Sequence, residues 1–198
     1  MGVVGLITEY NPFHKGHEYH IKKAKELTGA SNAIVIMSGN YVQRGTPAFL
    51  DKYTRTSIAL NHGADLVFEL PLPFSCSSAE YFALSAVTML NKTGIVDYIC
   101  FGAETDNLNL LEMISKTLVD AKRNEEHALN TLIKKLLKTG VNYASARSLA
   151  ICEYFNDGSI DDIVNKPNNI LAIEYLKALA MLNSDIKPVI IKRTLASY

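Results

Sequence analysis

The chain has 198 residues, of which 48% are hydrophobic and 20% are charged, with 20 basic side chains balanced by 20 acidic ones. This length and composition are typical of a globular domain with a full apolar core, and they exclude a disordered chain. A net charge of zero gives no global attraction to nucleic acid, so any RNA contact must use local patches. No apolar run approaches the roughly 20 residues that a membrane-spanning helix needs.

The first residues of the chain and its cysteines indicate the cellular compartment of the protein. The first ten residues, MGVVGLITEY, lack the basic segment of a secretory signal and instead predict a first strand. Cys76, Cys100 and Cys152 lie far apart and form no C-x-x-C pair, which suits a reducing compartment. We therefore expect a cytoplasmic protein.

Short apolar runs alternate with helical patterns through the first half of the chain. Strands are predicted at residues 3–8, 33–37, 66–70 and 98–101, with a fifth at 189–191. Helices are predicted at residues 16–28, 52–60 and 78–90, with Gly29 ending the first and Asp51 capping the second. Buried strands separated by helices indicate an α/β fold: a doubly wound, parallel, five-stranded, Rossmann-like sheet.

Residues 107–182 are mostly helical in pattern. Apolar residues recur three and four positions apart in LLEMISKTLV, ALNTLIKKLLK, ARSLAICEYF and NILAIEYLKALAML. We therefore expect a nucleotide-binding core at 1–106, a helical insertion at 107–182, and the last core strand at 183–198.

Two histidines follow the first predicted strand in the stretch EYNPFHKGH, residues 9–17. Ligands of parallel α/β sheets bind beyond the carboxyl ends of the strands, which is where this stretch lies. The N-terminus of the following helix is a ready anion site, and Gly16 allows close approach of a phosphate. His14 and His17 could then donate hydrogen bonds to phosphate oxygens.

Other interpretations of these histidines stay open at this point. His14, His17 and His20 could ligate zinc, although the usual helical H-E-x-x-H spacing is absent. His14 and His17 could also simply cap the helix and pack. Neither a G-x-G-x-x-G fingerprint nor a G-x-x-x-x-G-K-[ST] loop follows the strand.

His14-Lys15-Gly16-His17 resembles the His-x-Gly-His signature of the nucleotidyltransferase superfamily, in the expected strand–loop–helix context. More of the chain agrees, from about residue 3 to residue 193. The stretches EYNPFHKGHEYHI, MSGNYVQRGTPAFLDKYTR, GADLVFELP, VDYICFGAE and KPNNILAIEYLKAL resemble the tRNA(Met) cytidine acetate ligase family.

This resemblance implies a two-step, ATP-dependent ligase without a covalent enzyme intermediate. ATP and acetate form acetyl-adenylate, and the N4 amine of the wobble cytidine in elongator tRNA(Met) then takes the acetyl group. It implies ATP as a substrate with Mg²⁺ on the nucleotide, no metal bound by the protein itself, and His14 and His17 as catalytic groups facing the phosphates. The implied ATP-binding residues are Ile7, Thr8, Glu9, Tyr10, Asn11, Pro12, Phe13, His14, Lys15, Gly16, His17, Glu18, Tyr19, His20, Gly102, Asn168 and Arg193.

The chain differs from the family pattern at two positions and in length. Thr46 stands where the family has Glu, and Ala103 where it usually has Ser. Family members also continue past residue 198 with a second superfamily signature and a region that holds tRNA, so the chain is either a fragment or a short form. Tyr143-Ala144-Ser145-Ala146-Arg147 mimics that signature but is interpreted as a helix start.

Two other functions remain as alternatives. One is a nucleotidyltransferase that moves AMP or CMP to a small phosphorylated acceptor, because His14, Gly16 and His17 cannot distinguish it from the ligase. The other is a non-catalytic nucleotide-binding module, if the short form is natural.

Overall fold

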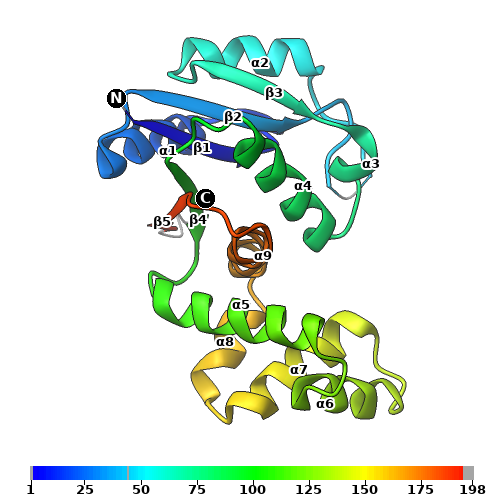
Figure 1. The fold of residues 1–198 in the computed structure, drawn as a ribbon. Helices are drawn as coiled ribbons and strands as arrows, with labels where there is room; N and C mark the ends of the chain where they lie inside the picture. The colour runs from blue at the N-terminus through cyan, green and yellow to red at the C-terminus, as the bar shows by residue number, and fades with distance from the viewer. Residues whose placement is uncertain (1, 44, 194–198) are drawn as a thin grey trace.

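The structure is a computed structural model that describes residues 2–43 and 45–193. Five parallel strands form one sheet in the order β3-β2-β1-β4-β5 (Figure 1). The strands are β1 (Val3–Thr8), β2 (Asn32–Ser38), β3 (Leu66–Leu70), β4 (Tyr98–Ala103) and β5 (Lys187–Lys192). The predicted five-stranded α/β sheet is therefore confirmed.

Helices cover both faces of this sheet, as a doubly wound fold requires. On one face, α1 (Lys15–Thr28) and α2 (Lys52–Asn61) pack on side chains such as Leu6 and Val35. On the other face, α4 (Ala79–Lys92) and α9 (Pro167–Leu182) pack on side chains such as Ile34 and Ile36. Because β1, β2 and β4 are buried on both faces, their sequences are continuous apolar runs without alternation.

The local signals for helix ends are confirmed. Gly29 adopts φ 65° after α1, and Asp51 accepts hydrogen bonds from the backbone N–H groups of Tyr53 and Thr54 at the start of α2. The helix predicted at residues 78–90 is α4, and Ser78 lies at its N-cap position without a capping side-chain hydrogen bond. A short helix after β3, α3 (Leu72–Ser75), was not predicted.

A second lobe of helices lies between β4 and α9 (Figure 1). It contains α5 (Leu108–Arg123), α6 (Ala128–Leu137), α7 (Tyr143–Phe155), the 3₁₀ turn η1 (Gly158–Ile160) and α8 (Asp161–Val164). The stretch that mimics the second signature is the first turn of α7, with Asn142 as its cap. The division of the chain at residues 106 and 182 stays a prediction.

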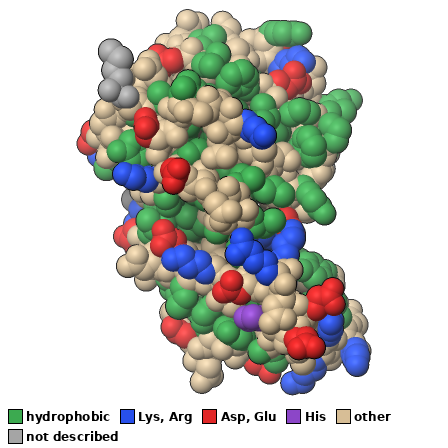
Figure 2. All heavy atoms as spheres, viewed as in Figure 1, with side chains coloured by type: hydrophobic (Ala, Val, Ile, Leu, Met, Phe, Trp, Pro, Cys, Tyr) green, Lys and Arg blue, Asp and Glu red, His purple; other side chains and the backbone are tan. Residues whose placement is uncertain are grey.

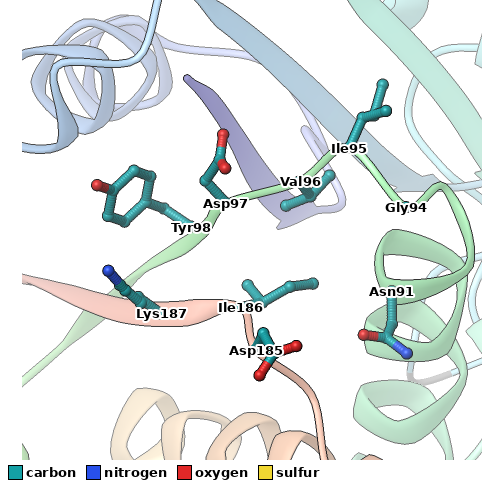
Figure 3. Close-up of a pocket in the computed structure, with 9 residues that line it drawn as sticks. All are labelled: Asn91, Gly94, Ile95, Val96, Asp97, Tyr98, Asp185, Ile186 and Lys187. Carbon is teal, nitrogen blue, oxygen red and sulfur yellow. The ribbon is translucent and has the colours of Figure 1, made fainter. Parts of the chain in front are cut away.

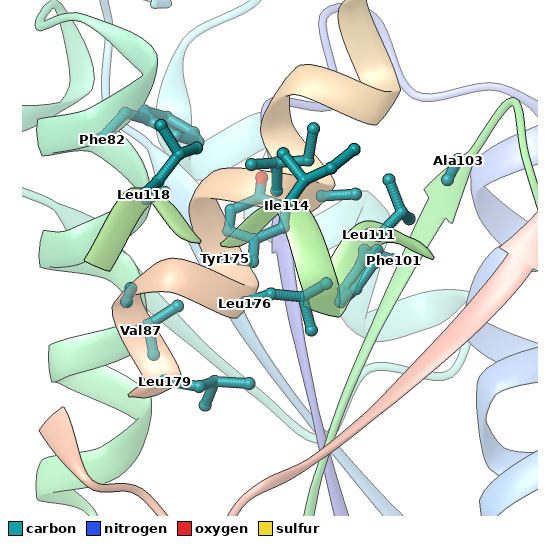
Figure 4. Close-up of a cluster of buried hydrophobic side chains, with 14 of the residues drawn as sticks. Phe82, Val87, Phe101, Ala103, Leu111, Ile114, Leu118, Tyr175, Leu176 and Leu179 are labelled. Carbon is teal, nitrogen blue, oxygen red and sulfur yellow. The ribbon is translucent and has the colours of Figure 1, made fainter. Parts of the chain in front are cut away.

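The largest apolar core joins the two lobes. Side chains of α4, α5 and α9 meet those of β4 in one buried cluster, which includes Phe82, Leu111, Ile114, Tyr175 and Phe101 (Figure 4). The helical lobe is thus held against the sheet through α5 and α9. Within the described residues, no helix combines the length and apolar character that crossing a bilayer requires.

Candidate functional site

The order in which the strands follow the chain reverses between β1 and β4. β1 pairs with β2 from Val3 to Thr8, but it pairs with β4 only at Val4 and Gly5. Beyond Gly5 the carboxyl halves of the two strands no longer pair, and the strand order reverses at this point. Ligands of open parallel sheets bind outside such a switch point.

The two signature histidines lie at the start of α1, directly after β1. His14 is the N-cap residue, and its Nδ1 accepts a hydrogen bond from the backbone N–H of Gly16 at 3.1 Å. The backbone N–H of His14 donates in turn to Nδ1 of His17 at 3.3 Å. The two imidazoles are stacked, with ring centroids 3.7 Å apart. The structure therefore shows the helix-capping role that the sequence left open for these histidines.

Capping does not compete with phosphate binding, because it uses only one nitrogen of each ring. A neutral imidazole whose Nδ1 accepts must carry its proton on Nε2. Both histidines therefore keep an Nε2–H donor for another group. Gly16 is needed for this arrangement, because a Cβ there would lie 2.9 Å from Cε1 of His14.

Two histidines of the site, His17 and His20, have lowered pKa values. Burial lowers the pKa of His17 from 6.5 to about 3, and the proximity of His14, His20 and Arg193 acts in the same direction. Burial also lowers the pKa of His20 to about 4, again with help from Arg193. At neutral pH the rings of His17 and His20 are therefore uncharged, and Arg193 is the positive charge beside them.

The loop between β1 and α1 is held by its own side chains. Tyr10 is buried, with a φ of 49° that is uncommon for a bulky residue. Its ring contacts those of Phe13 and His17, each with centroids 4.9 Å away. Glu9 accepts from the backbone N–H of Gln43, and Asn11 accepts from that of Phe49, both at 2.6 Å. The side-chain oxygens of Glu9 and Asn11 therefore position the loop.

Segments far apart in the sequence meet at the carboxyl ends of β4 and β5. Nη1 of Arg193 donates to Oδ1 of Asn168 at 2.8 Å, and the backbone N–H of Arg193 donates to Ala103. Cγ of Arg193 lies 3.1 Å from where a Cβ on Gly102 would stand. The structure thus brings together Gly102, Asn168 and Arg193, three predicted ATP-binding residues that are not neighbours in the sequence.

Asn168 and its neighbour Asn169 have different partners. Oε1 of Glu104 accepts from Nδ2 of Asn168 at 2.6 Å, which orients the amide toward Arg193. Asn169 is buried, and its Oδ1 accepts from the backbone N–H groups of Glu104 and Thr105. Glu104 was not predicted as a site residue. The only available signal was its position directly after β4, in FGAE.

Buried polar atoms without a hydrogen-bond partner gather around this edge of the sheet. Among the described residues, those at this edge are Thr8 Oγ1, Tyr10 OH, His20 Nε2, Ser38 Oγ and Asn169 Nδ2, whereas the carboxylate of Glu174, which also lacks a hydrogen bond, is ion-paired with Arg147 of the helical lobe. Buried polar groups in native proteins normally have partners, so the exceptions call for an explanation. A polar ligand or ordered water at this edge would supply the missing partners.

The other residues of the predicted 7–20 segment differ in burial and in their contacts. Ile7 packs into the core beneath α4. Lys15 is exposed, Glu18 pairs with Lys22 at 2.7 Å, and the side chain of Tyr19 is mostly exposed. Pro12 is exposed and follows a cis peptide bond.

A cavity of about 440 Å³ lies at the opposite end of the sheet (Figure 3). Asp97, Asp185 and Lys187 line it where β4 and β5 begin. It is remote from the signature histidines, because strand starts and strand ends lie at opposite edges of a parallel sheet. Among the described residues, no group of three or more His, Cys, Asp or Glu side chains is placed to hold a metal ion.

Comparison with known proteins agrees with this geometry. The family model described as "HIGH Nucleotidyl Transferase" matches residues 1–198. The chain belongs to the HIGH nucleotidyl transferase family. Its strand–histidine loop–helix unit is therefore the family's signature in its expected place.

The chain is also similar to tRNA(Met) cytidine acetate ligases and to one solved structure. It is 49% identical to a tRNA(Met) cytidine acetate ligase of Clostridium novyi and 45% identical to one of Halothermothrix orenii, covering 100% of this chain and 49% and 48% of theirs. A solved structure, Thermotoga maritima TmcAL bound with alpha-thio ATP, is 36% identical with a TM-score of 0.94, over 100% of this chain and 48% of that one. The chain spans about half the length of the relatives it matches.

Proposed function

We propose that this chain is the nucleotide-binding and adenylate-forming part of a tRNA(Met) cytidine acetate ligase. The observation that carries this proposal is the pair of histidines in the capping box of α1, each keeping an Nε2–H donor beside the β1–β4 switch point. Support comes from relatives named for that activity and from one relative bound to an ATP analogue. A cytoplasmic location is the natural setting for such an enzyme.

In the first step, an oxygen of acetate attacks the α-phosphorus of ATP. The new oxygen–phosphorus bond gives acetyl-adenylate, and the bond to the β-phosphate breaks to release pyrophosphate. Such a displacement needs positioned groups and neutralised charge more than covalent help from the protein. Nε2–H of His14 and His17 would donate to the phosphate oxygens as negative charge develops on them.

In the second step, the N4 amine of the wobble cytidine attacks the acetyl carbonyl carbon. The new carbon–nitrogen bond forms, the bond to the adenylate oxygen breaks, and AMP leaves while the amine loses a proton. The base must reach the adenylate, so we expect it to be unstacked from the anticodon loop of elongator tRNA(Met).

The remaining predicted residues have roles that follow from their positions. We assign the nucleotide to the loop and helix start at residues 7–20, with Gly102 close to the adenosine. Asn168, in the first turn of α9, would contact the nucleotide, and Arg193 would neutralise the charge of its phosphates. Mg²⁺ would arrive on the triphosphate, since it binds through phosphates with few protein ligands.

The proposal is tested by two measurements on the full-length protein. Calorimetry should detect ATP binding in the presence of Mg²⁺, and labelled pyrophosphate should exchange into ATP only when acetate is present. Failure to bind any nucleotide at millimolar concentration would remove the proposal. Exchange that ignores acetate and requires a phosphorylated acceptor would instead favour a nucleotidyltransferase that moves AMP or CMP.

A further inference from the structure

Arg55 is an arginine in α2 whose side chain is completely buried. Among the described residues, its hydrogen-bond partners are all backbone carbonyl oxygens. Nε donates to Leu50 at 3.0 Å, Nη1 donates to Glu9 at 2.5 Å and to Ser38 at 3.1 Å, and Nη2 donates to Gly39. One guanidinium thus binds four carbonyls from three separate segments.

Removing a cation of this kind from water costs free energy, so we expect its hydrogen bonds to have a purpose. Burial lowers the pKa of Arg55, and the charges of Glu9, Asp51 and Glu69 only partly oppose that effect. Apolar side chains of similar volume commonly replace buried charges without loss of stability. The planar five-donor fork, which no apolar residue or lysine can reproduce, is therefore the property that this position uses.

The segments that Arg55 joins surround the proposed nucleotide site. Glu9 belongs to the loop that leads from β1 to His14, Ser38 is the last residue of the neighbouring strand β2, and Gly39 follows it. The loop after β2 is tied back to the same segment, because Glu9 and Asn11 accept from backbone N–H groups within residues 43–49. Arg55 lies where these contacts converge, behind the loop and out of solvent.

We propose that Arg55 is a positioning residue for the nucleotide site. It acts through the backbone of Glu9, fixing the path of the loop that places His14 at the start of α1. It also holds the loop of residues 39–50 against that segment, so that the two loops behave as one unit. This inference rests on the proposed function, since it concerns the site at which ATP would bind.

The test compares two Arg55 variants with a matched arginine in the helical lobe. Arg55→Met removes all five donors, whereas Arg55→Lys keeps the charge but loses the fork. The control is Arg147→Met, because Nη2 of Arg147 lies 2.5 Å from Oε1 of the buried Glu174, remote from His14. ATP affinity and melting temperature are measured for each full-length protein.

We expect both Arg55 variants to weaken ATP binding by about 10- to 100-fold, the scale on which small misplacements of a site act. Arg147→Met should lower the melting temperature at least as much while leaving ATP affinity unchanged. If Arg55→Lys or Arg55→Met binds ATP as tightly as the unaltered protein, Arg55 only stabilises the fold and the inference is wrong. Arg55→Lys decides the question if Arg55→Met does not fold.

A second readout is independent of ATP. Hydrogen exchange of the Gln43 and Phe49 amides reports on the loop that Arg55 holds, since these amides donate to Glu9 and Asn11. We expect faster exchange in Arg55→Lys and no change in Arg147→Met; equal exchange in all three proteins would overturn the positioning role. If the unaltered protein binds no nucleotide, the proposed function fails, and this exchange measurement still decides whether Arg55 positions the loops.

Discussion

The capping hydrogen bonds at the start of α1 use Nδ1 of His14 and His17 and leave Nε2 of both rings as donors. A capping role and a phosphate-binding role can therefore be separated by substitution. Serine is among the best N-cap residues, so it can replace the acceptor of His14 without replacing its Nε2–H. The two roles then give different outcomes in stability and in activity.

We predict that His14→Ser changes the free energy of unfolding by less than about 0.5 kcal/mol, whereas His14→Ala costs about 1 kcal/mol. Both substitutions should slow acetate-dependent pyrophosphate exchange strongly. His17→Ala should slow the same exchange by roughly 10²–10³-fold, the scale for losing one transition-state donor. Urea unfolding and the exchange assay on the full-length enzyme measure the two effects.

His127 provides the control for these histidine variants. Its Nδ1 accepts from the backbone N–H of Leu129 at 3.2 Å, so it caps α6 as His14 caps α1, but in the helical lobe. His127→Ala should lower stability without changing the exchange rate. An unchanged rate in both His14→Ser and His17→Ala would leave these residues with a capping role only.

The lowered histidine pKa values also predict a dependence of stability on pH. His17 and His20 have folded-state pKa values of about 3 and about 4, below the unfolded value near 6.5. The unfolded chain therefore binds more protons, so their contribution is fully present above pH 6.5 and is lost as the pH falls toward the folded-state values.

Urea unfolding between pH 7.5 and pH 5 measures this effect before the carboxylates begin to titrate. We expect the free energy of unfolding to decrease steadily below about pH 6.5. His20→Gln should reduce the slope, because one of the two depressed groups is gone. A stability that stays constant across this range, or a slope that His20→Gln does not alter, would contradict the prediction.

At the scale of elements, an ion network connects the helical lobe to the helices on the sheet. Arg147 of α7 and Lys177 of α9 lie 2.5 and 2.7 Å from the carboxylate of Glu174, which is almost fully buried. Lys177 and Lys122 of α5 also reach Glu80 of α4, at 3.2 and 2.7 Å. In Figure 2, Lys and Arg side chains gather at the waist between the lobes, with Asp and Glu nearby.

We predict that Arg147→Met lowers the free energy of unfolding by about 3–5 kcal/mol, because it leaves Glu174 buried with one of its two partners missing. The double variant Arg147→Met/Glu174→Leu should recover at least half of that loss, since apolar side chains then replace the pair. Urea unfolding measures both. A double variant less stable than Arg147→Met would show that Glu174 is needed for more than its pairing with Arg147.

Most elements of the fold could be predicted from local sequence. All five strands were predicted within about two residues of their observed ends, because each is a compact apolar run bounded by turn or cap residues. The short helices α3 and α8 were missed, since four residues carry too little periodicity to distinguish a helix from a loop. Their formation depends on packing against neighbouring helices.

At the scale of the whole molecule, the balance of charge limits RNA binding. The chain has no net charge, and basic and acidic side chains are interspersed on the face shown in Figure 2. Strong tRNA binding normally requires several lysines or arginines that neutralise backbone phosphates. The proposed ligase would therefore hold tRNA mainly through the part that its longer relatives have beyond this half.

We predict that residues 1–198 bind ATP but bind tRNA(Met) only weakly, at about micromolar affinity or worse and with little preference over other tRNAs. Filter binding at physiological salt, with the full-length protein as a positive control, measures this. Submicromolar and tRNA(Met)-selective binding by residues 1–198 would place the recognition surface on this half.

The sequence by itself determined the fold class and the central motif of this protein. Continuous apolar strands between helices require a covered parallel sheet, and a histidine pair around Lys15 and Gly16 after the first strand marks the anion-binding end of a helix. The family resemblance selected Gly102, Asn168 and Arg193, but it could not show that they contact one another. Local patterns determine such features because they depend on residues that are neighbours in the chain.

Only the tertiary structure decided how distant segments act together. It showed the early separation of β1 from β4, the contact of Arg193 with Asn168, and the orientation of that amide by Glu104. It also revealed Arg55, whose position inside an ordinary amphipathic helix gives no local sign of four carbonyl partners. These contacts join residues far apart in the chain, and the packing of the whole sheet and its helices sets them, whereas local periodicity contains no information about them.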